Sequence, residues 1–137
     1  MNLKVKLDNN AICPTRAHKT DAGLDLYMPK NTTIWGCDVT VIDTGVHIEI
    51  PDGYVGYIKA RSSYLKRGIT VDGTIDSGYR GSIGVMLHNH VSHRFVLERG
   101  EKIAQLVIQP IELPDIVIVD ELEDTERGNG GFGSTGR

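Results

Sequence analysis

The sequence predicts a single all-β domain, either closed on itself or folded as a sandwich. Apolar and polar residues alternate with a period of two in many short runs that are rich in β-branched side chains, which is the pattern of half-buried strands. Clusters of Gly, Pro, Asn and Asp separate these runs as turns. No long stretch combines a helix N-cap with an apolar stripe at helical spacing. Many short strands at regular spacing are typical of β-sandwiches and barrels.

Strands are expected where the alternation is clearest. The predicted runs are 4–7, 39–42, 47–50, 54–60, 82–87, 94–97, 103–108 and 116–119. Leu24 and Leu26 would share one strand face and leave Asp25 on the other. One or two helical turns are expected directly after Ser62, and the glycines around Asp76 mark a hairpin.

Size and composition narrow the class of protein. A chain of 137 residues corresponds to one domain, since domains commonly run to about 100–150 residues. Hydrophobic residues make up 39% and charged residues 24%, which excludes a disordered chain. No apolar run approaches the ~20 residues of a membrane span, and the N-terminus lacks a signal-peptide core. We therefore expect a cytoplasmic protein without a membrane partner.

Charge and cysteine content point the same way. The formal net charge of −3 argues against a nucleic-acid partner. Any phosphate group must then be met by a few placed cations or by a metal ion. Cys13 and Cys37 follow no metal-ligand pattern and are expected to be reduced thiols.

The C-terminal residues 127–137 differ from the predicted domain, residues 1–126, because they are rich in glycine and are expected to form a mobile tail. Gly128, Gly130 and Gly133 match the dinucleotide-binding fingerprint formally, but no strand precedes them and no helix can follow. A Rossmann site is therefore not expected.

The same tail carries side chains suited to a nucleotide. Arg127 offers a fork of donors for phosphate, and Phe132 offers a ring on which a base could stack. Amides around Gly133, with the hydroxyls of Ser134 and Thr135, can surround phosphate oxygens. A solvated tail with one incidental Phe would account for the same composition.

Arg61, Ser62 and Ser63 follow a predicted strand directly. One guanidinium and two hydroxyls at a strand end suit a phosphate group. An N-capped helical turn with a surface arginine is the simpler structural interpretation, because Ser is a favoured cap.

The segment from Gly73 to Gly81 is the most informative. A carboxylate held at a hairpin, such as Asp76, can accept a proton from water, and the ring of Tyr79 offers a flat wall for a ligand. Alternatively, Asp76 forms the turn and Tyr79 is a half-buried strand residue.

Two further clusters could bind a metal. Asp21 and Asp25 could serve a metal shell directly or through water, or be solvated acids. His88, His90 and His93 lack the three or four supported ligands that zinc needs, so surface histidines near a turn are the better interpretation.

Taken together, five segments resemble, in order and spacing, the five motifs of the trimeric dUTP diphosphatases (dUTPases). They are DAGLDLY at Asp21, ARSS at Ala60, GTIDSGYRG at Gly73, RGEKIAQLVI at Arg99 and RGNGGFGSTG at Arg127. The resemblance covers the chain from about residue 3 to the end.

This resemblance implies a fold and an activity. The family is a jelly-roll-like, distorted β-barrel with a flexible glycine-rich C-terminal tail, and it forms homotrimers whose three active sites are shared between subunits. It hydrolyses dUTP to dUMP and diphosphate with Mg²⁺, which limits uracil in DNA and supplies dUMP for dTMP synthesis.

The resemblance also implies residue roles. Asp76 would orient and deprotonate the water that attacks the α-phosphorus, and Tyr79 would pack against deoxyribose and exclude a 2′-hydroxyl. The hairpin around Gly73 and Ile75 would read uracil through backbone groups. Asp25 would act on the metal through water. The implied phosphate binders are Arg61, Ser62, Ser63 and Gln105, and the implied lid over a neighbour's site comprises Arg127, Phe132, Gly133, Ser134 and Thr135.

Two departures and two alternatives accompany the resemblance. Ser63 stands where many members have Gly, and the hairpin containing Asp72 is shorter than in many bacterial members, which bears on base selectivity. The dCTP deaminases share the fold but carry a catalytic Glu where this chain has Met86, and they lack the tail. A non-enzymatic nucleotide-sensing or regulatory protein on the same barrel is the other alternative.

Overall fold

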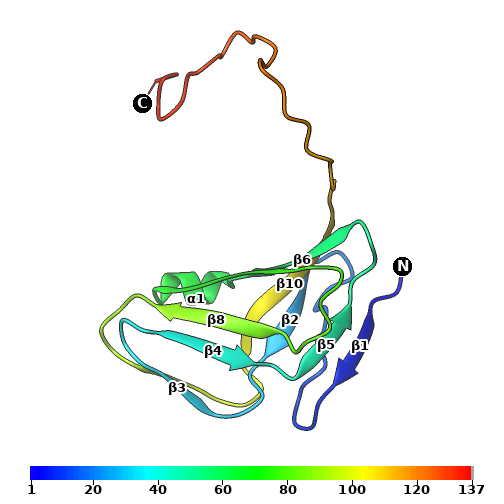
Figure 1. Cartoon of the computed structure of the whole chain (residues 1–137). Helices are drawn as coiled ribbons and strands as arrows, with labels where there is room; N and C mark the ends of the chain where they lie inside the picture. The colour runs from blue at the N-terminus through cyan, green and yellow to red at the C-terminus, as the bar shows by residue number, and fades with distance from the viewer. Residues whose placement is uncertain (137) are drawn as a thin grey trace.

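The computed structural model describes residues 1–136 and consists of antiparallel strands with one short helix in that range. The elements in chain order are β1 Lys4–Leu7, β2 Gly23–Tyr27, β3 Thr32–Ile34, β4 Val39–Asp43, β5 Val46–Glu49, β6 Tyr54–Lys59, α1 Ser62–Lys66, β7 Ile69–Ile75, β8 Gly84–Asn89, β9 Phe95–Leu97 and β10 Lys102–Pro110 (Figure 1). The predicted all-β class and the helical turn after Ser62 are confirmed.

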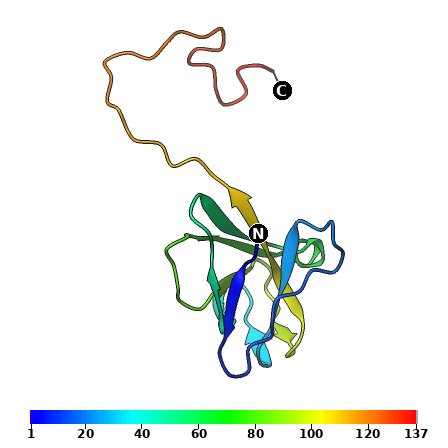
Figure 2. The same ribbon diagram turned by 90° about the vertical axis from the view of Figure 1, so that its right-hand side faces the viewer.

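One sheet forms most of the body. Its six strands run in the order β2-β10-β6-β7-β8-β4, and two strand pairs, β1-β5 and β3-β9, lie beside it. The sheet curls round into a half-barrel, which Figures 1 and 2 show from two sides. All the strand pairs are antiparallel.

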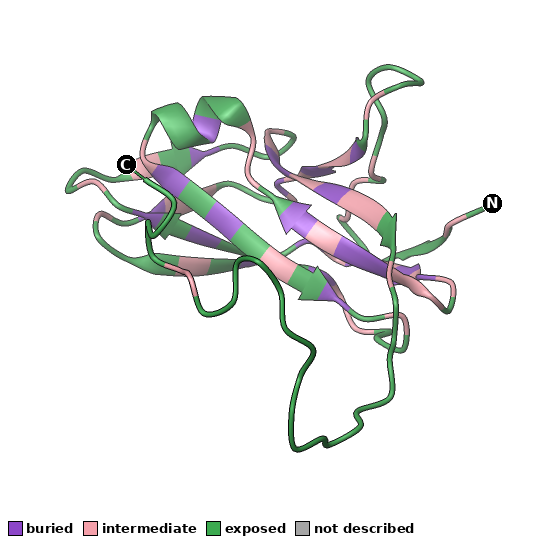
Figure 3. Cartoon of the chain, turned by 90° about the horizontal axis from the view of Figure 1, so that it is seen from above, coloured by how far each residue is buried: buried purple, intermediate pink, exposed green. Residues whose placement is uncertain are grey.

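The core lies inside this curl because the alternation in the sequence sets one face of each strand inward. On β8, Val85 and Leu87 are buried while Met86 and His88 are exposed, and Figure 3 shows the same alternating bands on the strands. Ile58 is fully buried at the centre of the sheet. Burying one such aliphatic side chain contributes about 1.5–3 kcal/mol, so the inward face holds the curl together.

Some predicted elements differ from the structure. The strand predicted at 116–119 is wrong, since Ile116 is 93% exposed and Ile118 94% exposed in a segment without strand pairing. A strand needs a neighbour for its backbone groups, and the described chain offers none there. β3 was not predicted, because its three residues depend on pairing with β9. The run predicted at 82–87 begins two residues later, at Gly84.

The C-terminal segment, residues 111–136, leaves the body at the end of β10 and extends away from it (Figures 1 and 2). The Ile111 amide donates to the Gly53 carbonyl at 2.9 Å. Beyond it, the hydrogen bonds found within 112–136 join residues three apart. Within residues 1–136, no helix has the length and apolar character needed to cross a membrane.

Candidate active site

The predicted site residues of the body fall into two groups, and the first lies where β2, β10 and the start of α1 meet. Asp25 on β2 pairs with Gln105 on β10, and Gln105 pairs in turn with Lys59 on β6. Cross-strand partners project from the same face of a sheet. Asp25 therefore faces away from Leu24 and Leu26, as predicted, and lies beside Gln105.

Lys102 joins this group, although the sequence analysis did not single it out. The register of β10 against β2 shifts between Lys102 and Ala104, so a β-bulge interrupts the alternation at Ile103. Lys102 Nζ then lies 3.0 Å from Asp25 Oδ2, with the Asp25 side chain only 16% exposed. A bulge redirects a side chain in a way that period-two reasoning cannot anticipate.

Arg61 and its two serines border the same group. Arg61 occupies the N-cap position of α1 and makes no side-chain capping bond, so the expected serine-capped turn does not form. Instead, Arg61 Nη1 donates to the Lys102 carbonyl at 3.2 Å, and the side-chain amide of Gln105 donates to the Ala60 carbonyl at 3.3 Å. The side chains of Ser62 and Ser63 are exposed on the first turn.

Tyr64 fixes the helix to the body. It is 3% exposed, and its burial, with the nearby Glu101 charge, raises the pKa of Tyr64 to about 12. The phenol therefore stays neutral at ordinary pH. Arg67 packs over the rings of Tyr64 and Phe95, which holds the far end of the helix in place.

The second group is the tight segment after β7. The Tyr79 amide donates to the Asp76 carbonyl at 3.1 Å, and the Tyr79 hydroxyl donates to the Ser82 carbonyl at 2.9 Å. A Cβ at Gly81 would lie 2.3 Å from the Tyr79 hydroxyl oxygen, so only glycine lets the ring fold back in this way. The Asp76 side chain is exposed on a turn whose backbone is fixed.

The strand before Asp76 has one open backbone edge. β7 pairs with β6 as far as Ile75, but its pairing with β8 ends at Asp72. Between Gly73 and Ile75 the two strands therefore separate, and backbone groups on that side have no ladder partner. The Asp72 carboxylate accepts a hydrogen bond from the backbone amide of the next residue, Gly73, at 3.0 Å.

Asp43 braces the end of the same segment. Ser82 donates its hydroxyl to the Asp43 carboxylate, and the Gly45 amide donates to the same oxygen at 3.0 Å. These two donors, the Ser82 hydroxyl first, hold the pKa of Asp43 below its usual range. The carboxylate is therefore ionised at neutral pH and ties the segment that carries Asp76 to β4.

One chain does not bring the two groups together. On the antiparallel strands β6 and β7, Lys59 pairs with Asp72. Arg61 follows Lys59 by two residues, and Asp76 follows Asp72 by four residues. Because the strands run in opposite directions, these two offsets add along the pair. At ~3.3 Å per residue, Arg61 and Asp76 are roughly 20 Å apart. The single chain thus holds the predicted phosphate binders and the predicted base at opposite ends of the β6–β7 pair.

The predicted lid stands apart from both groups. Phe132 is fully exposed and has a positive φ of 50°, followed by Gly133 at 85°. Arg127 Nε donates to the Gly130 carbonyl at 2.8 Å, which closes a local loop. Ser134 and Thr135 are exposed, and the last residue of the predicted lid segment, Arg137, lies outside the described residues.

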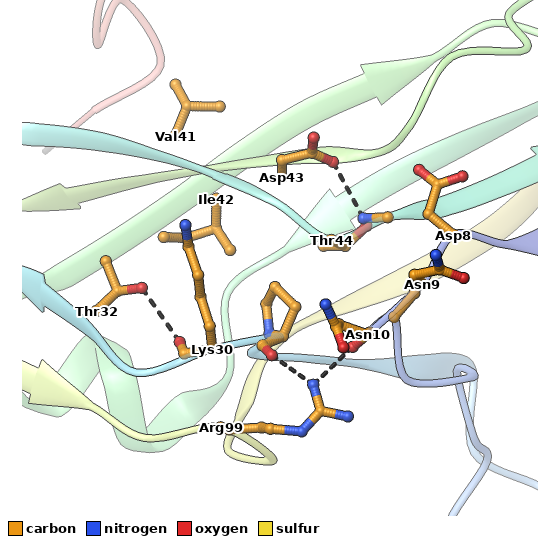
Figure 4. A pocket seen from close by; sticks show the side chains of 13 residues that line it. Asp8, Asn9, Asn10, Lys30, Thr32, Val41, Ile42, Asp43, Thr44 and Arg99 are labelled. Carbon is orange, nitrogen blue, oxygen red and sulfur yellow. Dashed lines mark hydrogen bonds between the residues drawn. The ribbon is translucent and has the colours of Figure 1, made fainter.

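One open hollow in the described structure lies away from both groups and the lid. It measures about 760 Å³ and is lined by Asp8, Asn9, Asn10, Ala11, Pro29, Lys30, Thr32, Val41, Ile42, Asp43, Thr44, Gly45 and Arg99 (Figure 4). Arg99 shapes one wall by donating to the Asn10 carbonyl at 2.6 Å and to the Pro29 carbonyl. None of the predicted site residues lines this hollow.

Asp25 is the predicted metal-linked acid, and its surroundings fit an indirect role. One of its carboxylate oxygens is paired with Lys102, which leaves the other to accept a hydrogen bond from a metal-bound water. Among residues 1–136, no three His, Cys, Asp or Glu side chains converge as a metal cage. Mg²⁺ commonly keeps waters and binds substrate phosphates with few protein ligands, which such an arrangement permits.

The histidines behave as surface groups. The rings of His88 and His90 stack with centroids 3.8 Å apart. His90 Nε2 lies 2.7 Å from the Thr70 hydroxyl, and His93 packs edge-on to Phe95.

The chain is similar to known proteins both in sequence and in fold. The dUTPase family model matches residues 9–136. The deoxyuridine 5′-triphosphate nucleotidohydrolase of Alkaliphilus metalliredigens is 48% identical over 140 residues, covering 98% of this chain and 97% of that protein. The dUTPase of Staphylococcus bacteriophage 80alpha, solved with dUpNHpp, superposes with a TM-score of 0.93 at 35% identity over 99% of both chains. A mutant dUTPase from phage phi11 of S. aureus, described with a structural Mg(II) ion, gives a TM-score of 0.85 at 31% identity, over 90% of this chain and 100% of that one.

Proposed function

The chain belongs to the dUTPase family and hydrolyses dUTP, and we propose that it does so by water attack on the α-phosphorus, releasing dUMP and diphosphate. The family match over residues 9–136 supports this activity, together with near-complete coverage at 48% identity by a named deoxyuridine 5′-triphosphate nucleotidohydrolase. In the cell the reaction limits uracil in DNA and supplies dUMP for dTMP synthesis.

Asp76 is the general base. Its carboxylate is exposed at the end of β7, where a water could bridge it to a bound nucleotide. An ordinary aspartate is ionised at pH 7 and accepts a proton from that water as the new P–O bond forms and the bond to diphosphate breaks. Because the Tyr79 amide fixes the Asp76 backbone, little reorganisation is needed in the transition state.

The open edge of β7 reads the base. Unpaired backbone groups between Gly73 and Ile75 supply donors and acceptors of the kind that the edge of uracil requires. The Tyr79 ring, 44% exposed and held by its hydroxyl, forms a flat wall for the sugar. Its position leaves deoxyribose in contact and excludes a 2′-hydroxyl.

The first group holds the phosphates. Arg61, Ser62, Ser63 and Gln105 provide a guanidinium, two hydroxyls and an amide around one end of the sheet. Mg²⁺, carried with the triphosphate, neutralises charge on the phosphate oxygens. When the ion is bound, the free carboxylate oxygen of Asp25 would accept a hydrogen bond from one of its waters, while Lys102 neutralises the other oxygen.

The active unit is a homotrimer in which each site combines groups from different subunits. The roughly 20 Å between Arg61 and Asp76 in one chain supports this arrangement, because both groups are proposed to act on the phosphates of one nucleotide. Exposed Ile116 and Ile118 offer apolar surface for a neighbour. Residues 127–137 form the lid that one subunit lends to another, and residues 1–126 form the barrel domain.

Arg127, Phe132, Gly133, Ser134 and Thr135 close the site. Phe132 stacks on uracil, while the other four supply a guanidinium, amides and hydroxyls to the phosphates. The tail leaves the sheet at the end where β7 finishes, since Pro110 pairs with Tyr54 and Ile75 pairs with Gly56 on the same strand, β6.

We also propose that the protein is located in the cytoplasm. Cys13 and Cys37 are free, exposed thiols, and such thiols are kept reduced in the cytoplasm.

A substrate panel tests the activity. Purified protein is given dUTP, dCTP, dTTP and UTP, each with Mg²⁺ or with a chelator, and both diphosphate and ammonia are measured. We expect diphosphate from dUTP alone, only with Mg²⁺. Ammonia from dCTP would instead identify a deaminase, and binding of dUTP without product would identify a sensor.

A further inference from the structure

We propose that His47 is a positioning residue for this hydrolysis: from β5 it holds the backbone of Arg80, and through Arg80 the turn that carries Asp76 and Tyr79. The inference rests on the proposed role of Asp76, because it adds a support to the same site. His47 lies outside the five segments that resemble dUTPase motifs, so those segments do not point to it.

The His47 ring spans two acceptors from distant parts of the chain. Its Nδ1 lies 2.7 Å from the Arg80 carbonyl oxygen, and its Nε2 lies 3.0 Å from Oδ2 of Asp8. Asp8 is itself fixed, since its amide donates to the Gly45 carbonyl at 2.9 Å. The His47 side chain is 24% exposed, so water screens these contacts only in part.

Both contacts require the charged ring. A carbonyl oxygen and a carboxylate can only accept, whereas neutral imidazole carries one N–H and imidazolium carries two. The neutral ring therefore satisfies either Arg80 or Asp8, and places a lone pair against the other. The Arg80 carbonyl first, and the Asp8 carboxylate next, raise the pKa of His47, against smaller opposing effects of desolvation and Lys6.

Arg80 passes this support to the turn. Its Nη1 donates to the Ser77 carbonyl at 2.7 Å and to the Tyr79 carbonyl at 3.1 Å. Its Nη2 lies 3.5 Å from Oε1 of Glu49, two residues after His47 on the same strand. The backbone of Arg80 and its guanidinium are thus both held from β5.

The charged groups around the ring set the direction of the pH effect. The charged groups that face His47, or line the groove beside it, are Lys4, Lys6, Asp8, Asp43, Glu49 and Arg80. Because the pKa is raised in the folded protein, the doubly bonded ring is fully present below the ordinary value near 6.5. It is lost as the pH rises through the raised value.

Loss of this contact changes orientation rather than binding of the phosphates. Once His47 is neutral, Arg80 or Asp8 is released and the turn gains freedom. A small displacement of a base can cost between about tenfold and a hundredfold in rate. We therefore expect kcat to fall more than KM rises.

The first test compares wild-type protein with His47→Leu and His47→Gln, with kcat and KM for dUTP measured from about pH 5.5 to pH 9. The ratio of wild-type to His47→Leu kcat should be roughly tenfold near pH 6 and approach one near pH 9. His47→Gln keeps one donor and should lose less activity, with no pH dependence of its own. His93→Gln, a surface histidine away from Arg80, should follow the wild type.

A loss that is equal at every pH would assign His47 a purely structural role, and a ratio of one throughout would remove it from the mechanism. Thermal unfolding of each variant identifies any that fails to fold. Should His47→Leu unfold, His47→Gln and Asp8→Asn still decide the matter through their pH profiles.

A second readout needs no turnover. In NMR titrations without nucleotide, the amide signals of Ser77, Tyr79 and Ser82 should move with the midpoint of the His47 ring in the wild type, and not in His47→Gln. Such coupling in a protein that fails to hydrolyse dUTP would contradict the proposed function, and would leave only the support of the turn by His47 standing. Normal hydrolysis without coupling would overturn the role of His47 alone.

Discussion

Two short segments of this chain resemble each other in composition but differ in how they are held. Residues 73–82 and residues 127–136 each combine glycines and hydroxyl side chains with one arginine and one aromatic ring. The first is held from other strands by Asp43, His47 and Glu49, whereas the hydrogen bonds of the second are local and reach no further than Thr125. The body therefore holds one part of the proposed site in place, and we expect the other part to become ordered only against a partner surface.

The largest expected effect lies in the braced segment. Asp76→Asn removes the proposed base but keeps the shape of the turn, so kcat should fall by ~10²–10⁴ with a modest change in KM. Steady-state kinetics with dUTP measure this effect. Asp52→Asn, at an exposed turn, is the matched control and should retain activity, while unchanged turnover in Asp76→Asn would end the assignment of the base.

The C-terminal segment from residue 127 should matter almost as much for activity as Asp76, and little for the stability of the fold. Deleting residues 127–137 removes the proposed lid, and we expect roughly a 10²-fold loss of kcat/KM. Thermal unfolding and size-exclusion chromatography should match the full chain, because the described part of this tail is mostly exposed and its hydrogen bonds reach no further than Thr125. An unfolded truncated protein would show that the tail is part of the core instead.

Gly81 tests how the Tyr79 ring is held within residues 73–82. In Gly81→Ala the new Cβ would meet the Tyr79 hydroxyl at 2.3 Å, so the ring must move and kcat/KM should fall by about tenfold. The variant should also accept UTP more readily, as should Tyr79→Ala. Gly78→Ala, where a Cβ meets nothing within 4 Å, is the control. If Gly81→Ala and Gly78→Ala behave alike, Tyr79 does not discriminate between dUTP and UTP.

The smallest expected effect is on stability at the extremes of pH. Hydrogen bonds to Asp43 and Asp21, and to Glu49 from Lys4, lower the pKa of each carboxyl, so their contribution is present above about pH 4 and is lost as the pH falls. The raised pKa of His47 gives a contribution that is lost on the alkaline side. Urea midpoints should therefore be highest between these limits, in the full chain and the truncated chain alike.

The sequence predicted the features that depend on local patterns. Alternation identified most strands and the inward faces, and Ser62 correctly marked the helical turn. The run 116–119 shows the limit, because an alternating apolar run becomes a strand only beside a partner, and residues 111–136 have none in this chain. Lys102 shows another, since the bulge at Ile103 changes which side chain meets Asp25.

Long-range contacts account for the remaining omissions. His47 contacts Arg80, which is 33 residues away, and no spacing rule links them. The two predicted groups of the site could be named from motifs, but their separation along the β6–β7 pair required the register. Because this register places the two groups far apart in one chain, the central claim is that the site is shared between subunits.

A complementation experiment tests that claim most directly. Asp76→Asn chains and chains lacking residues 127–137 are co-expressed with different tags, and mixed trimers are purified through both tags. If one subunit lends its tail to the Asp76 of another, a mixed trimer holds one intact site, so about a third of the wild-type activity should return, although each parent is nearly inactive. Mixed trimers as inactive as their parents would show that tail and base act within one chain, contrary to this account.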